Sequence, residues 1–134
     1  MLVVDTSVLV YATGTDHPLR EPAIRLLRDI TAQQTQATTT PEVLQEYAHV
    51  RGKRLDRPST LAQAERLAGL LAPLTVVNPQ DILEALRLWS TTPTIGAFDA
   101  VLASIALARD WSVVSSDRGF GSIAGLNWVD LAAY

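Results

Sequence analysis

Hydrophobic and polar positions follow two different periods along this chain. Short β-branched runs, such as residues 2–4, are typical of strands buried on both faces of a sheet. Between them lie longer segments in which apolar residues recur every three or four positions, which predicts amphipathic helices. Residues 18–33 show this second period plainly, with apolar side chains on one face and mainly arginines on the other.

Proline, glycine and small polar residues divide these segments. Thr40 is a suitable helix N-cap with Pro41 at the first helical position, and Pro73 ends a later helix. The expected strands cover residues 2–4, the Thr-rich segment 36–40, 75–78, 111–117 and 126–131. The first expected helix begins after Thr6 and Ser7, which can cap it. The other expected helices cover residues 18–33, 41–51, 58–71, 79–89 and 98–110. This alternation predicts one α/β domain over residues 1–134, with helices on both faces of a central, mostly parallel sheet of four to five strands.

Composition limits the classes of protein to consider. Charged residues make up 19% of the 134 positions, which is ordinary for a globular domain, and the net charge of −3 predicts no global attraction to nucleic acid. The absence of cysteine excludes disulfides and thiolate chemistry. We expect no signal peptide and no membrane span, because no apolar run is long enough, and therefore a cytoplasmic protein.

Three carboxylates stand alone in apolar surroundings. Asp5 follows the first strand directly, Asp117 follows the strand VVSS, and Asp99 lies near the start of a helix rich in Ala, Val, Leu and Ile. Each has a structural explanation, since Asp favours helix caps, turns and first helical turns. Together they favour a site, because buried carboxylates are costly unless they are neutralised, paired or bound to a metal.

A fourth acid comes from the helix that begins at Pro41. At 100° per residue Glu46 falls beside the apolar stripe of this helix, whereas Glu42 lies further round and is explained by the helix dipole. Four carboxylates form a hard oxygen site that suits Mg²⁺ or Mn²⁺ and the hydrolysis of phosphodiesters. With only His17 and His49 available, a zinc site is not expected.

Four segments in order resemble the PIN-domain ribonucleases, and in particular the VapC toxins of bacterial toxin–antitoxin pairs. They are VVDTSVLV, PEVLQEYAHVR, FDAVLASIALA and VVSSDRGF. The resemblance implies a PIN-like three-layer α/β/α fold and a Mg²⁺-dependent endoribonuclease that cleaves structured RNA such as tRNA or rRNA. It places the family acids on Asp5, Glu46, Asp99 and Asp117 as metal-binding and catalytic residues, with Ser7 supporting them through a hydrogen bond. It also implies a homodimer and a VapB-type antitoxin that blocks the pocket.

The segment RGKRLDR, residues 51–57, holds four of the eleven basic residues at the end of the helix that carries Glu46. It is a candidate phosphate-binding patch, although basic residues also favour helix C-termini for structural reasons. Arg118, beside Asp117, is a second candidate. The three tryptophans are assigned to the core or to an interface.

Two other functions are compatible with an acidic site. A Mg²⁺-dependent phosphatase would need a second Asp at the position of Ser7, and a phospho-receiver domain would need a late lysine, whereas Lys53 is the only lysine. A non-enzymatic binding module, in which the acids hold a structural cation or a basic peptide, is the other alternative. Replacement of Asp99 by Asn distinguishes the enzyme from the binding module, because only the enzyme has a metal-dependent RNA cleavage activity to lose.

Overall fold

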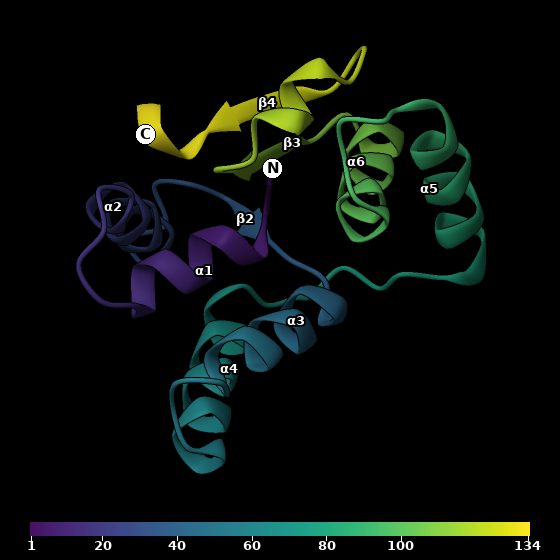
Figure 1. The fold of residues 1–134 in the computed structure, drawn as a ribbon. Helices are drawn as coiled ribbons and strands as arrows, with labels where there is room; N and C mark the ends of the chain where they lie inside the picture. Colours follow the sequence, from purple (N-terminus) through teal and green to yellow (C-terminus); the bar gives the residue numbers. More distant parts are fainter.

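The strands and helices of residues 1–134 are drawn in Figure 1 from a computed structural model. In chain order they are β1 (Leu2–Val4), α1 (Thr6–Thr13), α2 (Arg20–Thr31), β2 (Ala37–Thr38), α3 (Pro41–Arg51), α4 (Arg57–Leu70), α5 (Pro79–Thr91), α6 (Ala97–Arg109), β3 (Ser112–Ser115), the 3₁₀ helix η1 (Arg118–Ser122), β4 (Asn127–Asp130) and the 3₁₀ helix η2 (Leu131–Ala133). No helix has both the length and the hydropathy needed to cross a membrane.

The four strands form one parallel sheet in the order β2-β1-β3-β4. β1 is central, and its residues Leu2 and Val4 pair with Ser112 and Val114 of β3. The strand order reverses at β1, because the chain continues from β1 to β2 on one side and later returns to β3 on the other. In open parallel sheets, this reversal leaves a crevice at the carboxyl ends of the two strands.

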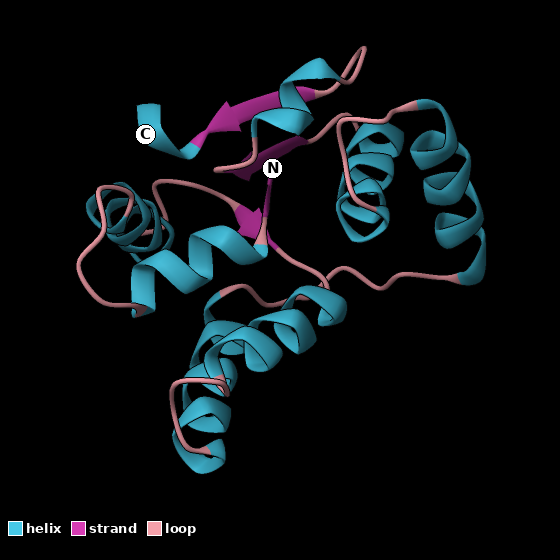
Figure 2. Ribbon diagram, viewed as in Figure 1, coloured by secondary structure: helices cyan, strands magenta, loops and turns pink.

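Helices flank the strands on both sides, which confirms the expected α/β/α arrangement. Figures 1 and 2 show α1 and α2 on one side of the strands, the α5–α6 pair on the other, and α3 with α4 below. Parallel strands need such helical crossovers, and because each crossover is right-handed, connections that run in opposite directions along the sheet lie on opposite faces. The helix at Pro41 begins as expected, with Thr40 as N-cap and Pro41 in its first turn.

The central strands are the middle of the core. Val3 and Val4 of β1 and Val113 and Val114 of β3 have no exposed surface, and they belong to a single cluster of 22 buried apolar residues. Burial of such a side chain contributes about 1.5–3 kcal/mol. A polar side chain directly after these strands is therefore anchored to the most rigid part of the molecule.

The strand expected at residues 75–78 does not form. This segment is an extended connection from α4 to α5, held to the end of β2 by a hydrogen bond of 2.8 Å from the Thr75 N–H to the Thr39 carbonyl oxygen. Val76 is 74% exposed, so the β-branched pair there does not enter the core. The prediction was wrong because this segment makes only one backbone hydrogen bond beside the edge strand β2, and a short apolar run does not reveal whether a full ladder will form.

Candidate active site

Asp5 and Ser115 occupy the crevice between β1 and β3. Asp5 follows β1, and Ser115 is the last residue of β3, so strand pairing brings the two together. Both are buried. The backbone N–H of Asp5 donates to the Val114 carbonyl oxygen at 3.1 Å, which extends the strand pairing up to the carboxylate.

The Asp5 carboxylate is fixed by three hydrogen bonds to the same oxygen. Oδ2 accepts from the Ser115 hydroxyl at 2.7 Å, from the Ser7 hydroxyl at 2.6 Å and from the Ser7 backbone N–H at 3.3 Å. The last of these makes Asp5, rather than Thr6 or Ser7, the N-cap of α1. The Ser7 hydroxyl bond is the one that the family resemblance implies. Because these donors all use Oδ2, the other oxygen, Oδ1, is left for a ligand.

Asp117 lies two residues beyond β3 and is tied to the same network. Its backbone N–H donates to the Ser115 hydroxyl oxygen at 2.9 Å, while its own Oδ1 accepts from the Gly119 N–H at 2.7 Å. The second bond caps η1. Ser115 therefore connects Asp5 and Asp117. Asp5 and Asp117 each cap a helix and also face the crevice, so their structural role as caps does not exclude a role in a site.

Glu46 reaches the crevice from the middle of α3. Its Oε2 accepts a hydrogen bond of 2.6 Å from the hydroxyl of Thr6, the residue directly after Asp5. This contact joins α3 to the start of α1 and orients an otherwise exposed carboxylate. Glu42, one turn earlier, has no such contact in the site.

Asp99 faces the other acids from the first turn of α6. Burial is the largest cause that raises the pKa of this carboxyl, from 3.8 to about 6, and the negative charges of Asp5 and Asp117 raise the pKa further. Glu46 adds a smaller effect in the same direction, and the Gly96 backbone opposes it. The four acids are thus close enough to repel one another.

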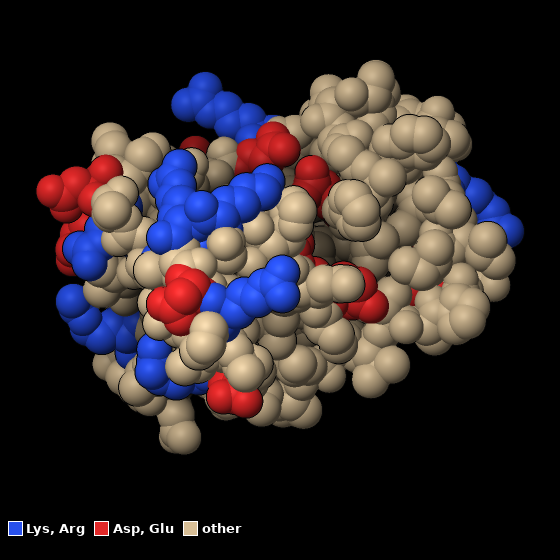
Figure 3. Space-filling view, turned by 60° about the horizontal axis from the view of Figure 1, so that its bottom comes forward, with Lys and Arg blue, Asp and Glu red and all other residues tan.

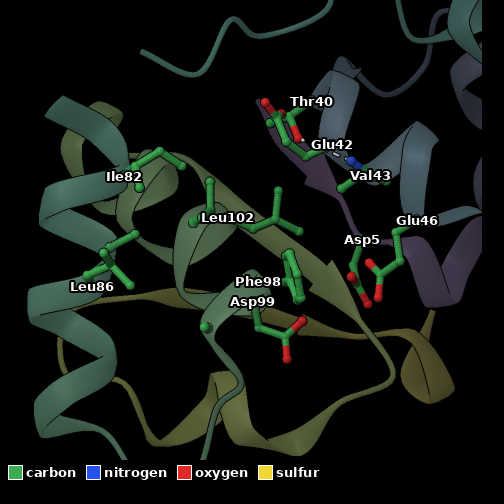
Figure 4. Close-up of a pocket in the computed structure, with 13 residues that line it drawn as sticks. Asp5, Thr40, Glu42, Val43, Glu46, Ile82, Leu86, Phe98, Asp99 and Leu102 are labelled. Atoms are coloured by element: carbon green, nitrogen blue, oxygen red, sulfur yellow. Dashed lines mark hydrogen bonds between the residues drawn. The ribbon is translucent and has the colours of Figure 1, made fainter. Parts of the chain in front are cut away.

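All four acids line one open cleft of about 600 Å³, which we call the acidic cleft. In Figure 4, Asp5 and Glu46 lie side by side and Asp99 faces them across the cavity. No three acidic or histidine side chains are gathered tightly enough to form a complete coordination shell. The donors nevertheless suit a hard divalent cation, because they are oxygens only and a cation would relieve their mutual repulsion.

An apolar pocket of about 220 Å³ adjoins the acids on the side of α5 and α6. Ile82, Leu86, Phe98 and Leu102 point into it in Figure 4, and it shares Asp5, Glu46 and Asp99 with the acidic cleft. Phe98 is 79% exposed, and further exposed apolar side chains of α5 extend this surface. The site therefore has an acidic centre with an apolar flank.

The sequence indicated the four acids but not the side chains that hold them. Ser115 is a key donor, yet only the pairing of β1 with β3 reveals it, and the one signal in the sequence is a small polar residue at a strand end. Thr6 was expected to act as a helix cap, whereas its hydroxyl donates to Glu46. His17 and His49 are both exposed.

Comparisons with known proteins agree with this architecture. A family model described as PIN domain matches residues 2–126. The chain is 41% identical to Ribonuclease VapC7 of Mycobacterium tuberculosis over 130 residues, which cover 92% of this chain and 87% of that protein. The structure of VapBC-1 from nontypeable Haemophilus influenzae matches with a TM-score of 0.72 at 16% identity over 97% of each chain. A toxin–antitoxin complex from Klebsiella pneumoniae matches with a TM-score of 0.67 at 18% identity over 98% of each chain.

Proposed function

Because this chain belongs to the PIN-domain family, we propose that it is a divalent-metal-dependent endoribonuclease and the toxin of a VapBC-type toxin–antitoxin pair. The observation that supports this most directly is the convergence of Asp5, Glu46, Asp99 and Asp117 on one cleft. Its relative VapC7 is named a ribonuclease, and solved structures with this fold are toxin–antitoxin complexes.

In this proposal the four carboxylates hold Mg²⁺, with Mn²⁺ as a substitute. The bound metal supplies a Lewis acid for the scissile phosphate and lowers the pKa of the attacking water. Asp5 presents Oδ1, because Oδ2 is engaged by Ser7 and Ser115. Asp99 must lose its proton to take part, and Asp117 completes the acidic wall.

Glu46 has a different role from the three aspartates. It projects from the middle of a helix rather than from a strand end or a first helical turn, and the Thr6 hydroxyl fixes its Oε2. Its second oxygen is thus positioned to accept a hydrogen bond from water at the rim of the cleft. We assign to Glu46 the orientation of the attacking water, with the three aspartates as the main ligands of the metal ion.

The apolar flank of the cleft supports a protein partner. Leu83, Leu86, Trp89 and Phe98 are exposed, and contiguous exposed apolar surface is typical of interaction sites. Figure 3 shows the uncharged face beside the hollow that contains acidic side chains. We assign this face to a VapB-type antitoxin, which would cover the acids. A homodimer is also expected from the family resemblance.

The test is metal-dependent RNA cleavage by the purified chain and by Asp99→Asn. We expect the wild type to cut RNA in Mg²⁺ and the variant to lose this activity while keeping its fold, since Asn preserves the shape but not the charge. Asp110→Asn is the matched control, because Asp110 is exposed at the opposite end of α6. Cleavage by Asp99→Asn at the wild-type rate would reject the proposed site.

The main alternative is a non-enzymatic module that binds a cation or a basic peptide through the same acids. It predicts metal binding by the wild type without cleavage of any species in total RNA. Because all variants are purified in parallel, a contaminating nuclease would appear equally in Asp99→Asn.

A further inference from the structure

The acidic cleft continues beyond the four acids toward the C-terminal end of α3. There it is lined by Val10 and Tyr11 of α1, by His17, and by Val50, Arg51, Lys53 and Arg54. Figure 3 shows basic side chains gathered on one side of the hollow, while the opposite side is almost without charge. The cleft therefore has an acidic end and a basic end, the latter defined by Arg51, Lys53 and Arg54.

Arg51 is built into the wall of this basic end. Its side chain is 93% buried, since only 7% of its surface is exposed. Nη2 donates to the Thr13 carbonyl oxygen at 3.0 Å, whereas Nε has no hydrogen-bond partner. A buried guanidinium that bonds a neutral carbonyl retains an uncompensated positive charge. An anion in the cleft would compensate this charge.

Lys53 and Arg54 are exposed and are not needed to cap α3. The carbonyl oxygen of Ala48 accepts from the Gly52 N–H, and that of Arg51 accepts from the N–H groups of Arg54 and Leu55, all at 2.9 Å. The backbone itself thus satisfies two of the last carbonyl oxygens of the helix, which weakens the explanation of these charges as caps. Their side chains remain available to a ligand in the cleft.

His17 adds a ring nitrogen donor to the same end. Its Nδ1 accepts a hydrogen bond of 3.1 Å from the Leu19 backbone N–H, which leaves Nε2 as the donor of the ring. The ring stacks on Tyr11 with 4.3 Å between centroids, which fixes its plane. Acidic residues line only the other end of the cleft.

We propose that Arg51, Lys53 and Arg54 form a subsite for a backbone phosphate of the RNA strand whose scissile phosphate lies at the four acids. This inference rests on the proposed ribonuclease activity. Glu46 and Arg51 are five residues apart on α3, or about 8 Å along the helix axis at 1.5 Å per residue. That spacing is comparable to the distance between adjacent phosphates of a single strand. The subsite therefore holds a flanking nucleotide and contributes to binding rather than to the chemical step.

The test compares Lys53→Ala/Arg54→Ala with Arg25→Ala/Arg28→Ala, which removes two exposed charges from α2, away from the cleft. Binding to a short single-stranded RNA of mixed sequence is measured by fluorescence anisotropy at several salt concentrations, in the Asp99→Asn background to prevent cleavage. Cleavage kinetics are measured with Asp99 intact.

We expect the cleft variant to reduce the slope of log Kd against log salt by about 0.7, the value for the loss of one phosphate contact with a single strand. Its KM should rise about tenfold with kcat within about twofold, while the control matches the parent. If the cleft variant and the control behave alike while the wild type cuts RNA, the subsite is refuted and the proposed function stands. A wild type that cuts no RNA in Mg²⁺ refutes both.

Discussion

The hydroxyl of Ser115 donates a hydrogen bond of 2.7 Å to Oδ2 of Asp5, although 110 positions separate the two residues along the chain. The contact exists because β1 and β3 are parallel neighbours whose carboxyl ends coincide. The same hydroxyl oxygen accepts from the Asp117 N–H. One buried serine therefore sets the relative position of two of the four acids.

Removal of this serine hydroxyl should impair both stability and catalysis. In Ser115→Ala, Asp5 loses a donor to a charged acceptor, a bond worth about 1.5–3 kcal/mol. We also expect a loss of about 10–100-fold in cleavage or Mg²⁺ affinity, as is usual for residues that orient metal ligands. Chemical denaturation and calorimetric Mg²⁺ titration measure the two effects. Ser116→Ala is the control, since only the backbone of Ser116 contacts the network, and an equal loss there would contradict the assignment.

The two glutamates of α3 should differ in function. Glu46→Gln removes the charge that is oriented by Thr6, and we expect cleavage to fall by about 10²-fold or more, the range of general-base contributions. Glu42→Gln, one helical turn away, should stay within about twofold of the wild type. Initial cleavage rates at saturating Mg²⁺ provide the comparison. A greater effect of Glu42→Gln would reverse the assignment.

Asp99 should make the metal-free protein less stable as the pH rises. Its pKa is raised from 3.8 to about 6, by burial first and then by neighbouring acids. Between these values the folded state binds more protons than the unfolded chain, so stability falls as the pH rises through this interval and levels off above it.

This dependence is measurable by denaturation in chelator at about pH 5 and about pH 7.5, on either side of the raised pKa. Asp99→Asn should be more stable than the wild type at the higher pH. At the lower pH the free energies of unfolding of the two proteins should be closer. Added Mg²⁺ should then favour the wild type, because a ligand that binds the folded state stabilises it. A difference independent of pH would show that the pKa of Asp99 is not shifted.

Replacement of a glycine by alanine should have opposite effects on stability at two positions. A Cβ on Gly119 would lie 2.3 Å from the Thr94 carbonyl oxygen and 3.1 Å from Oδ1 of Asp117. We expect Gly119→Ala to cost about 1–3 kcal/mol through overpacking and to displace Asp117. Gly69 lies in α4, where an added Cβ would meet no atom within 4 Å, and Gly69→Ala should stabilise the protein by about 0.5–1 kcal/mol. Thermal and chemical unfolding test the pair.

The apolar flank should matter for partner binding and not for RNA cleavage. Leu86→Asp places a charge on this face, and we expect loss of the complex with a VapB-type antitoxin, with cleavage by the free chain within about twofold. Leu61→Asp, on the exposed face of α4, is the matched control. Calorimetric titration of the purified antitoxin measures the affinity. Equal affinity for both variants would place the antitoxin elsewhere.

The periodicity of the chain determined most of the secondary structure and the fold class. Apolar runs at β1 and β3, the helical spacing of α2 and the Thr40–Pro41 cap are local signals, because they depend on a residue and its near neighbours. The expected strand at 75–78 does not form, because strand formation does not depend on local signals alone. Its residues have β propensity, but strand formation also needs a continuous ladder of hydrogen bonds, whereas this segment makes a single one beside β2 and Val76 remains in solvent.

Three of the acids were visible in the sequence because an isolated carboxylate interrupts an apolar segment, and Glu46 was visible because it falls beside the apolar stripe of its helix. Their common cleft, the Ser115 bond to Asp5 and the Thr6 bond to Glu46 were decided by tertiary structure alone. A periodic pattern specifies which face of an element is buried, and it contains no record of which strand lies beside which. Pairing of β1 with β3 and packing of α3 against α1 supply that information, since they bring together residues that are far apart along the chain.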